Sequence, residues 1–394
     1  MRPWFHHPSV KSLLLGLCAA ALTLTLHLLP IWENMLNRGA ETWDEQPAPR
    51  DYIESVIAAH SDGSDPAFAR RPWTTWSIDL LTRFGLAPRS AFITIGLLGF
   101  FIAGVLVFRI ALQLGADERI ALWSQALFQV SPTVLMAWFD PLYTYDEPIQ
   151  YALLLAAILL LLQQRWLLFV PVLFTALMAR ETSLLLLPAL ILLAPRRRLA
   201  LLATLVATAV FAAWLAMAPH GTSAAELGAD LARRSGYLAV NFSAGRIGET
   251  IGFLVLVLAL PLFLLIRQRI AVPPAWFRGF VVVLALNVPL VLVGGYAREA
   301  RLFALPLILA WPWIGIALHS ELDRRGGLTG LLSAFRSPGK AVALIGSTII
   351  VALCAYRFFI LTATWQQDNL FHEYLIAQLA FIAACAIASR RRVA

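Results

Sequence analysis

The sequence predicts an all-α protein that crosses a membrane many times, with residues 1–394 forming one integral membrane domain. Of its 394 residues, 60% are hydrophobic and only 14% are charged, and the mean hydropathy is +0.74. Long apolar runs recur from one end to the other, separated by short charged or Pro/Gly clusters. Because only helices and closed barrels satisfy the backbone in lipid, runs of this length indicate transmembrane helices.

About twelve membrane segments are expected. They are 12–31, 90–113, 120–138, 149–163, 166–179, 182–195, 199–217, 250–266, 278–295, 302–318, 340–358 and 372–389. The first segment follows a basic start and could be a cleaved signal peptide. Its length and the lack of a small-x-small cleavage site favour an uncleaved first helix instead.

The basic residues are distributed unequally between the two sides of this arrangement. With the N-terminus in the cytoplasm, the cytoplasmic segments hold 18 of the 31 basic residues and 4 of the 23 acidic ones. The positive-inside rule therefore places both termini in the cytoplasm and loops 32–88 and 218–249 outside. The net charge of +8 follows from this topology and does not indicate nucleic-acid binding.

Arg180 and Glu181 stand side by side in the apolar run 175–190, where a charge at the bilayer centre costs about 2.5–3.5 kcal/mol. The basic residues at Arg165 and 196–198 are both predicted to be cytoplasmic. About 15 residues per leg lie between them, which is about 22 Å of helix against a core of about 30 Å. The sequence predicts a short helical hairpin whose Arg180-Glu181 apex lines an outward-facing cavity. One long tilted helix with a lateral ion pair is the alternative.

The remaining charged groups gather in the predicted outer segments. The first loop, 32–88, carries Asp44, Glu45 and Asp51, and segments 50–60 and 73–84 have the helical spacing of interfacial helices. The loop AWFDPLYTYDEPIQY carries Tyr143, Tyr145 and Asp146. These segments make the outer side the side where chemistry is expected.

A late outer turn, GGYAREAR, carries Arg298 and Arg301 directly after two glycines. Residues three apart lie on one helix face. The two arginines either pair with neighbouring acids such as Glu299 or present a guanidinium fork to a phosphate.

Common motifs for nucleotide binding, metal binding and serine hydrolysis are missing from the sequence. It contains no P-loop, GxGxxG, HExxH or GxSxG motif, and the three cysteines form no CxxC or Cys/His cluster. No cofactor is assigned, although the acids of the first outer loop leave a divalent cation as an option.

Four short motifs suggest a family: FARRP at 68–72, YDEP at 145–148, RETS at 180–183 and AREAR at 297–301. With the long acidic and aromatic first loop, they resemble the GT-C superfamily of integral membrane glycosyltransferases, and more narrowly its poorly characterised bacterial members. Asp44-Glu45 is the adjacent acidic pair nearest to the acidic motif of that superfamily.

The resemblance implies transfer of a sugar from a polyprenyl-phosphate donor to a glycan, lipid or protein acceptor, outside the bacterial inner membrane. The implied catalytic residues, which accept the proton of the acceptor hydroxyl, are Asp44, Glu45 and Asp51. The implied substrate-binding residues are Arg71, Tyr143, Tyr145, Asp146, Arg180, Glu181, Arg298 and Arg301. Within this set, arginines face the donor phosphate, tyrosines stack on sugar, and Glu181 orients Arg180 or an arginine of the late turn.

Two other classes of function remain open. Broken helices with charges at membrane depth are also typical of transporters and lipid flippases. An envelope assembly protein would use the same charges only as interhelical pairs.

Overall fold

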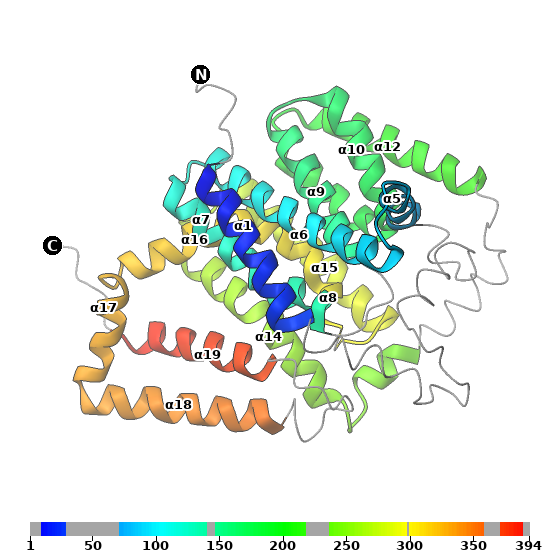
Figure 1. The fold of residues 1–394 in the computed structure, drawn as a ribbon. Coiled ribbons are helices and arrows are strands. Elements are labelled where there is room, and N and C mark those ends of the chain that lie inside the picture. Colours follow the sequence, from blue (N-terminus) through cyan, green and yellow to red (C-terminus); the bar gives the residue numbers. More distant parts are fainter. Residues whose placement is uncertain are drawn as a thin grey trace, which may run out of the picture. The chain divides into compact units, whose positions relative to one another are not determined.

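The computed structural model describes residues 9–28, 71–139, 146–217, 236–297, 299–357 and 371–388. All regular structure within these ranges is helical, and they contain no strand (Figure 1). The predicted all-α fold is therefore confirmed for the described part of the chain.

Within the described ranges, six helical segments are long and apolar enough to cross a membrane. They are α6 (Pro88–Gln113), α12 (Arg197–Met217), α14 (Ile247–Arg267), α15 (Pro274–Gly294), the segment Ala300–Asp323 and α18 (Pro338–Tyr356). Their length and hydropathy support a multi-pass membrane protein. The cellular compartment and the side of the termini stay predictions.

By its internal contacts the chain divides into two compact units. The first comprises Met1–Val130 and Val134–Ala229, and the second comprises Ser131–Thr133 and Asp230–Ala394.

The first unit is built around α6. Its other elements are α1 (Val10–Thr23), a π-helical extension (Leu24–Leu28), α5 (Pro72–Arg83), α7 (Glu118–Gln129), most of α8 (Pro132–Phe139), α9 (Asp146–Leu162), α10 (Trp166–Ala179), the 3-10 helix η3 (Glu181–Leu186), α11 (Leu187–Leu193) and α12. Helix α9 packs against both α6 and α10. At Gly99 of α6 a Cβ would lie 2.8 Å from the Pro148 carbonyl carbon, so glycine lets α6 closely approach the start of α9.

The predicted single span 120–138 is wrong, because the helix is interrupted between α7 and α8. Val130 and Ser131 fall outside both helices, and Pro132 begins α8. Proline lacks an N–H group and is favoured in the first turn of a helix, so it starts a new helix here.

The interruption that the hairpin prediction requires is present, so the alternative of one continuous tilted helix is wrong. Helix α10 ends at Ala179, Arg180 is extended with φ −162° and ψ 124°, and η3 begins at Glu181. The Ser183 hydroxyl donates a 3.0 Å hydrogen bond to the Ala176 carbonyl, seven residues earlier. In a continuous helix that separation would be about 10 Å, so the chain turns back at Arg180.

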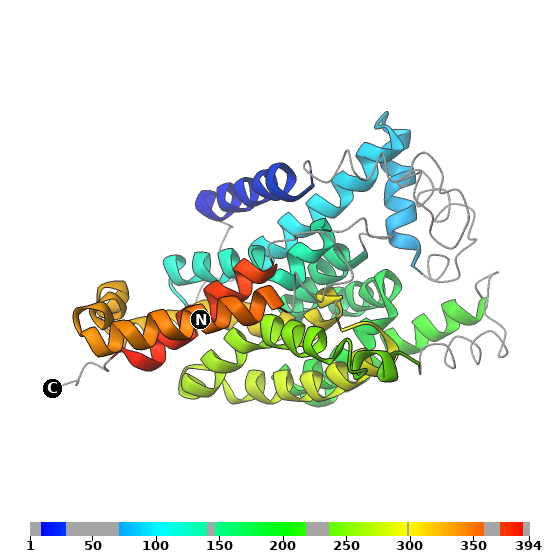
Figure 2. The ribbon, with the colours of Figure 1, turned by 90° about the horizontal axis from the view of Figure 1, so that it is seen from below.

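The second unit is built around α16 (Ala304–Asp323), which is preceded by η5 (Ala300–Phe303) and has Trp311 and Trp313 fully buried. Its other elements are α14, η4 (Arg269–Ala271), α15, α17 (Gly327–Leu332), η6 (Ser333–Arg336), α18 and α19 (Phe371–Ile387). Helices α18 and α19 lie side by side (Figure 2).

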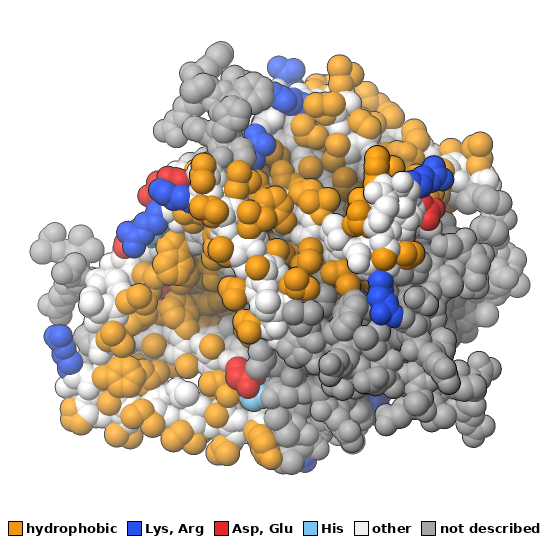
Figure 3. All heavy atoms as spheres, in the orientation of Figure 1, with side chains coloured by type: hydrophobic (Ala, Val, Ile, Leu, Met, Phe, Trp, Pro, Cys, Tyr) orange, Lys and Arg blue, Asp and Glu red, His pale blue; other side chains and the backbone are white. Residues whose placement is uncertain are grey.

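Large hydrophobic side chains are exposed on both units, including Leu201 and Leu205 of α12 and Ile345 and Ile349 of α18. Hydrophobic side chains are also spread widely over the face in Figure 3. In water such surface would be unfavourable, whereas lipid chains would cover it.

Candidate functional site

The three acidic side chains of the candidate site stand at the starts of helices. Asp146 and Glu147 lie in the first turn of α9, and Glu181 lies in the first turn of η3. The unpaired N–H groups of a helix N-terminus favour negative charge. The three carboxylates therefore lie where a helix favours negative charge.

Arg71, the residue before α5, joins two of these acids. Its Nε and Nη2 donate hydrogen bonds of 2.9 and 2.7 Å to the two carboxylate oxygens of Glu181. Its Nη1 lies 3.7 Å from Asp146 Oδ2. Burial lowers the pKa of the Arg71 guanidinium, but its acidic neighbours, Glu181 first, raise it by more.

The ion pair with Arg71 also shifts the pKa of Glu181. Burial raises the pKa of this carboxyl, but the charge of Arg71 and its hydrogen bonds outweigh burial and lower it to about 2. Glu181 is therefore ionised at neutral pH. Its side chain is 36% exposed, against 12% for Arg71, so Glu181 is the open end of the pair.

The other two acids are almost fully enclosed and have fixed partners. Asp146 accepts a hydrogen bond from the Thr74 hydroxyl of α5, and Glu147 forms an ion pair with Arg180 Nη1. The Nε of Arg180 is buried and has no hydrogen-bond acceptor within the described residues. A ligand oxygen at this position would satisfy that donor.

A glutamine holds the hairpin against α9. Gln150 Nε2 donates to the Ser183 hydroxyl at 2.8 Å and to the Thr182 hydroxyl at 3.1 Å. Gln150 follows Glu147 by three residues, so the two side chains share one face of α9. This face therefore positions both Arg180 and the residues that follow it.

We call this group the acid–arginine cluster. Its members are Arg71, Thr74, Asp146, Glu147, Gln150, Arg180, Glu181, Thr182 and Ser183. The structure thus brings together four of the predicted site residues, Arg71, Asp146, Arg180 and Glu181. Thr74, Glu147 and Gln150 were not among the predicted site residues. The three-residue spacing of Glu147 and Gln150, which places both on one helix face, was a signal for two of them.

The other predicted site residues fall elsewhere. Asp44, Glu45, Asp51, Tyr143, Tyr145 and Arg298, like segment 50–60, lie outside the described residues. Arg301 belongs to the second unit, where its Nη2 donates a 2.9 Å hydrogen bond to Glu299.

The expected partner of Glu181 was wrong. Glu181 pairs with Arg71, whereas Arg180 pairs with Glu147. Arg180 is extended, and consecutive side chains of an extended chain point in opposite directions. Adjacent residues at the apex therefore find different partners.

The predicted Gly-Gly break in the second unit is present, and a buried asparagine holds it. Helix α15 ends at Gly294, and Asn241 Nδ2 donates to the carbonyls of Leu292 and Gly295 at 2.9 and 2.8 Å. Asn241 Oδ1 accepts from the Ala297 backbone N–H at 3.1 Å. These bonds replace the helix hydrogen bonds that end there.

A second buried ionic group was overlooked because its residues were interpreted only as a topology signal. Glu321 Oε1 lies 3.1 Å from Arg267 Nε and 2.8 Å from Arg325 Nη2. Arg325 Nη1 also donates a 2.7 Å hydrogen bond to the Ala388 carbonyl, just beyond α19. These contacts connect α14, α16 and the end of α19, which is a structural role.

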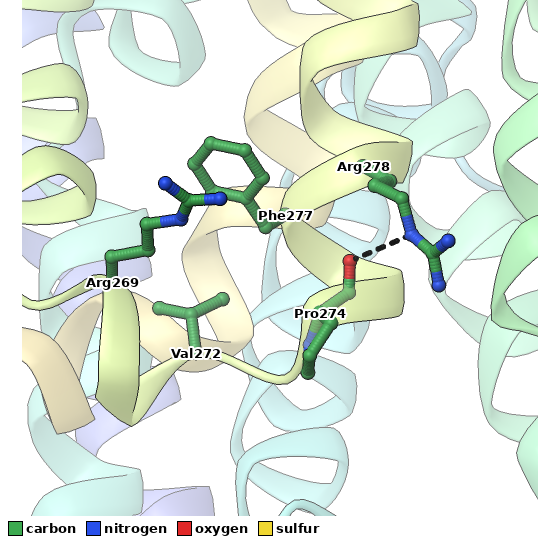
Figure 4. Close-up of a pocket in the computed structure, with 5 residues that line it drawn as sticks. All are labelled: Arg269, Val272, Pro274, Phe277 and Arg278. Atoms are coloured by element: carbon green, nitrogen blue, oxygen red, sulfur yellow. Dashed lines mark hydrogen bonds between the residues drawn. The ribbon is translucent and has the colours of Figure 1, made fainter.

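A shallow hollow in the second unit is lined by Arg269, Val272, Pro274, Phe277 and Arg278 (Figure 4). The Arg269 guanidinium lies 5.0 Å from the Phe277 ring centre, and Arg278 Nε donates to the Pro274 carbonyl at 3.3 Å. In Figure 4 the two guanidinium groups lie apart, that of Arg269 beside the Phe277 ring and that of Arg278 on the far side of Pro274. They do not converge on one ligand, so the hollow lacks the geometry of a binding site.

In the described part of the chain, no group of three or more His, Cys, Asp or Glu side chains is arranged to hold a metal ion. Comparisons of the chain with protein-family models, curated proteins and solved structures find no match.

Proposed function

We propose that the protein is a membrane glycosyltransferase that moves a sugar from a polyprenyl-phosphate-linked donor to an envelope acceptor outside the membrane. The observation that carries the proposal is the convergence of three motifs on one cluster. Arg71 comes from FARRP, Asp146 from YDEP, and Arg180 and Glu181 from RETS. These are three of the four motifs on which the resemblance to GT-C glycosyltransferases depends.

The cluster contains the groups that such a transfer needs for its leaving group. The bond between the sugar anomeric carbon and the phosphate oxygen breaks, and its electron pair leaves with the polyprenyl phosphate. Two guanidinium groups can stabilise that charge without changing protonation. The buried Nε of Arg180, which has no acceptor among the described residues, is the donor best placed to donate a hydrogen bond to a phosphate oxygen.

The acceptor hydroxyl forms the new bond to the anomeric carbon and gives its proton to a carboxylate. Asp44, Glu45 and Asp51 stay the proposed bases, since they lie on the loop that leads into Arg71. Asp146 is the reserve candidate, because it lies in the cluster beside Arg71 and Thr74.

Turnover of the donor tests this proposal without knowledge of the acceptor. Purified protein in proteoliposomes would receive a panel of polyprenyl-phosphate-linked sugars together with envelope extract, and the release of polyprenyl phosphate would be measured. We expect Arg180→Gln to reduce release at least a hundredfold, the usual effect of losing an electrostatic transition-state contact. The matched control is Arg197→Gln, which changes an exposed arginine of the same unit. No release from any donor by the unmodified protein would contradict the proposal.

A transporter is the second candidate, because the cluster places buried charges at a break in an apolar hairpin. Such breaks are typical of transporters, in which a buried carboxylate can bind a proton or cation and couple it to transport. Proteoliposomes containing a pH-sensitive dye would then acidify on addition of sugar phosphates or polyprenyl-phosphate lipids, without cleavage of the lipid. Glu147→Gln should abolish that signal.

A further inference from the structure

The Arg71 guanidinium binds an anion through a two-point contact. Both oxygens of Glu181 accept from it, through Nε and Nη2. A phosphate group presents two oxygens to a guanidinium in the same fork geometry. The Glu181 carboxylate therefore occupies the position that a ligand phosphate would take.

Glu181 is also the acid of the cluster that can leave most easily. Its side chain is 36% exposed, whereas those of Asp146 and Glu147 are 1% and 2% exposed. It begins η3 directly after the extended residue Arg180, so its side chain can rotate outward without breaking a helix. Asp146 and Glu147 keep their partners Thr74 and Arg180 when it does.

We propose that Glu181 is a displaceable latch on Arg71, and that a phosphate-bearing ligand binds by replacing the Glu181 carboxylate in the Arg71 fork. A phosphodiester carries one negative charge, as glutamate does, so the exchange preserves the charge of the cluster. The latch excludes weaker anions from the fork when no ligand is bound. The identification of the ligand as a polyprenyl-phosphate lipid rests on the proposed function, whereas the exchange of anions does not.

Binding measurements on the full-length protein in nanodiscs test the latch. The probes are polyprenyl phosphate, inorganic phosphate and, as the uncharged control, polyprenol. If Glu181 competes with the ligand, Glu181→Gln should tighten phosphate binding about tenfold, because a neutral amide competes poorly for a guanidinium. Arg71→Gln should weaken it at least as much. Glu181→Asp keeps the charge but shortens the side chain by one methylene, so it should tighten binding by a smaller factor and serves if Glu181→Gln does not fold.

The control variant is Glu118→Gln, which makes the same chemical change in the Lys11–Glu118 ion pair at the start of α7 and should leave binding unchanged. Weaker binding by Glu181→Gln, or by Glu181→Asp in its place, would mean that Glu181 holds Arg71 in position, and would overturn the latch. Unchanged binding by both Arg71→Gln and the Glu181 variant would also overturn it. If the Glu181 variant bound inorganic phosphate more tightly but polyprenyl phosphate no more tightly, the latch would stand and its ligand would be free phosphate. The proposed function fails separately, if the unmodified protein neither binds polyprenyl phosphate nor cleaves its sugar conjugates.

Discussion

Arg71 and Glu181 are 110 residues apart in the chain, yet they are joined by two hydrogen bonds of 2.9 and 2.7 Å. This pair connects the later part of the first predicted outer loop with the apex of the hairpin. Asp146, 3.7 Å from Arg71, adds the start of α9 to the same group. One set of charges therefore links the segment at Arg71, the start of α9 and the apex of the hairpin.

Acid should weaken this pair in a defined pH range. Because the pKa of Glu181 is lowered to about 2, its contribution to stability is fully present above the unfolded value of about 4.3. It is lost as the pH falls from there through about 2. The difference in thermal unfolding temperature between the unmodified protein and Glu181→Gln should shrink over that range and be constant above it. A difference that grows on acidification would contradict the lowered pKa.

Removing the partner of Arg180 should destabilise the first unit strongly. Glu147→Gln leaves the buried Arg180 guanidinium without its carboxylate, which costs about 3–5 kcal/mol of the free energy of unfolding. Denaturant unfolding in detergent measures this loss. Glu118→Gln, at a more exposed ion pair, should change stability far less. Equal effects of the two variants would show that Arg180 is not enclosed.

The hydrogen bonds of Gln150 should hold the hairpin closed. Gln150→Leu removes the donor to Thr182 and Ser183 and should cost about 1–3 kcal/mol. Hydrogen exchange should then increase in residues 180–186 and stay unchanged in α7. Unaltered exchange in the hairpin would mean that helix packing alone holds it.

The ionic group of the second unit should control the docking of α19. Glu321→Gln leaves Arg325 and Arg267 without their shared carboxylate. Because Arg325 also binds the Ala388 carbonyl, we expect faster hydrogen exchange at the end of α19. His319→Gln, which changes a more exposed pair on the same helix, is the matched control. Protection of α19 that survives Glu321→Gln would remove this role.

Cysteine labelling from outside the cell tests the predicted membrane topology. In a variant lacking the three native cysteines, Ser64→Cys and Ser223→Cys should react with a membrane-impermeant reagent added outside the cells, since both residues lie in predicted outer loops. Labelling only after permeabilisation would reverse the predicted orientation.

The sequence was sufficient for the helices and for the hairpin, because apolar runs, glycines and prolines act locally. Pro132, by contrast, shows why one predicted span was wrong. The run 120–138 is apolar on average, but a single proline after Ser131 divides it into α7 and α8.

The partners within the cluster depend on distant contacts that local patterns do not encode. Glu181 was expected to orient Arg180 or an arginine of the late turn, but it pairs with Arg71, and the extended backbone at Arg180 directs the two neighbouring side chains to different partners. Thr74 is a partner of Asp146 only because the fold brings α5 next to the start of α9. The motifs thus identified the residues, while the fold determined which side chains meet.

Photo-crosslinking shows whether the acid–arginine cluster binds the phosphate of a polyprenyl lipid. A polyprenyl phosphate carrying a diazirine beside the phosphate would be bound to the protein in nanodiscs and irradiated, and the labelled peptides would be identified by mass spectrometry. We expect labels in peptides containing Arg71, Asp146 and Arg180, and their loss on competition with unlabelled polyprenyl phosphate. Labels confined to lipid-exposed helices such as α18, and insensitive to competition, would contradict it.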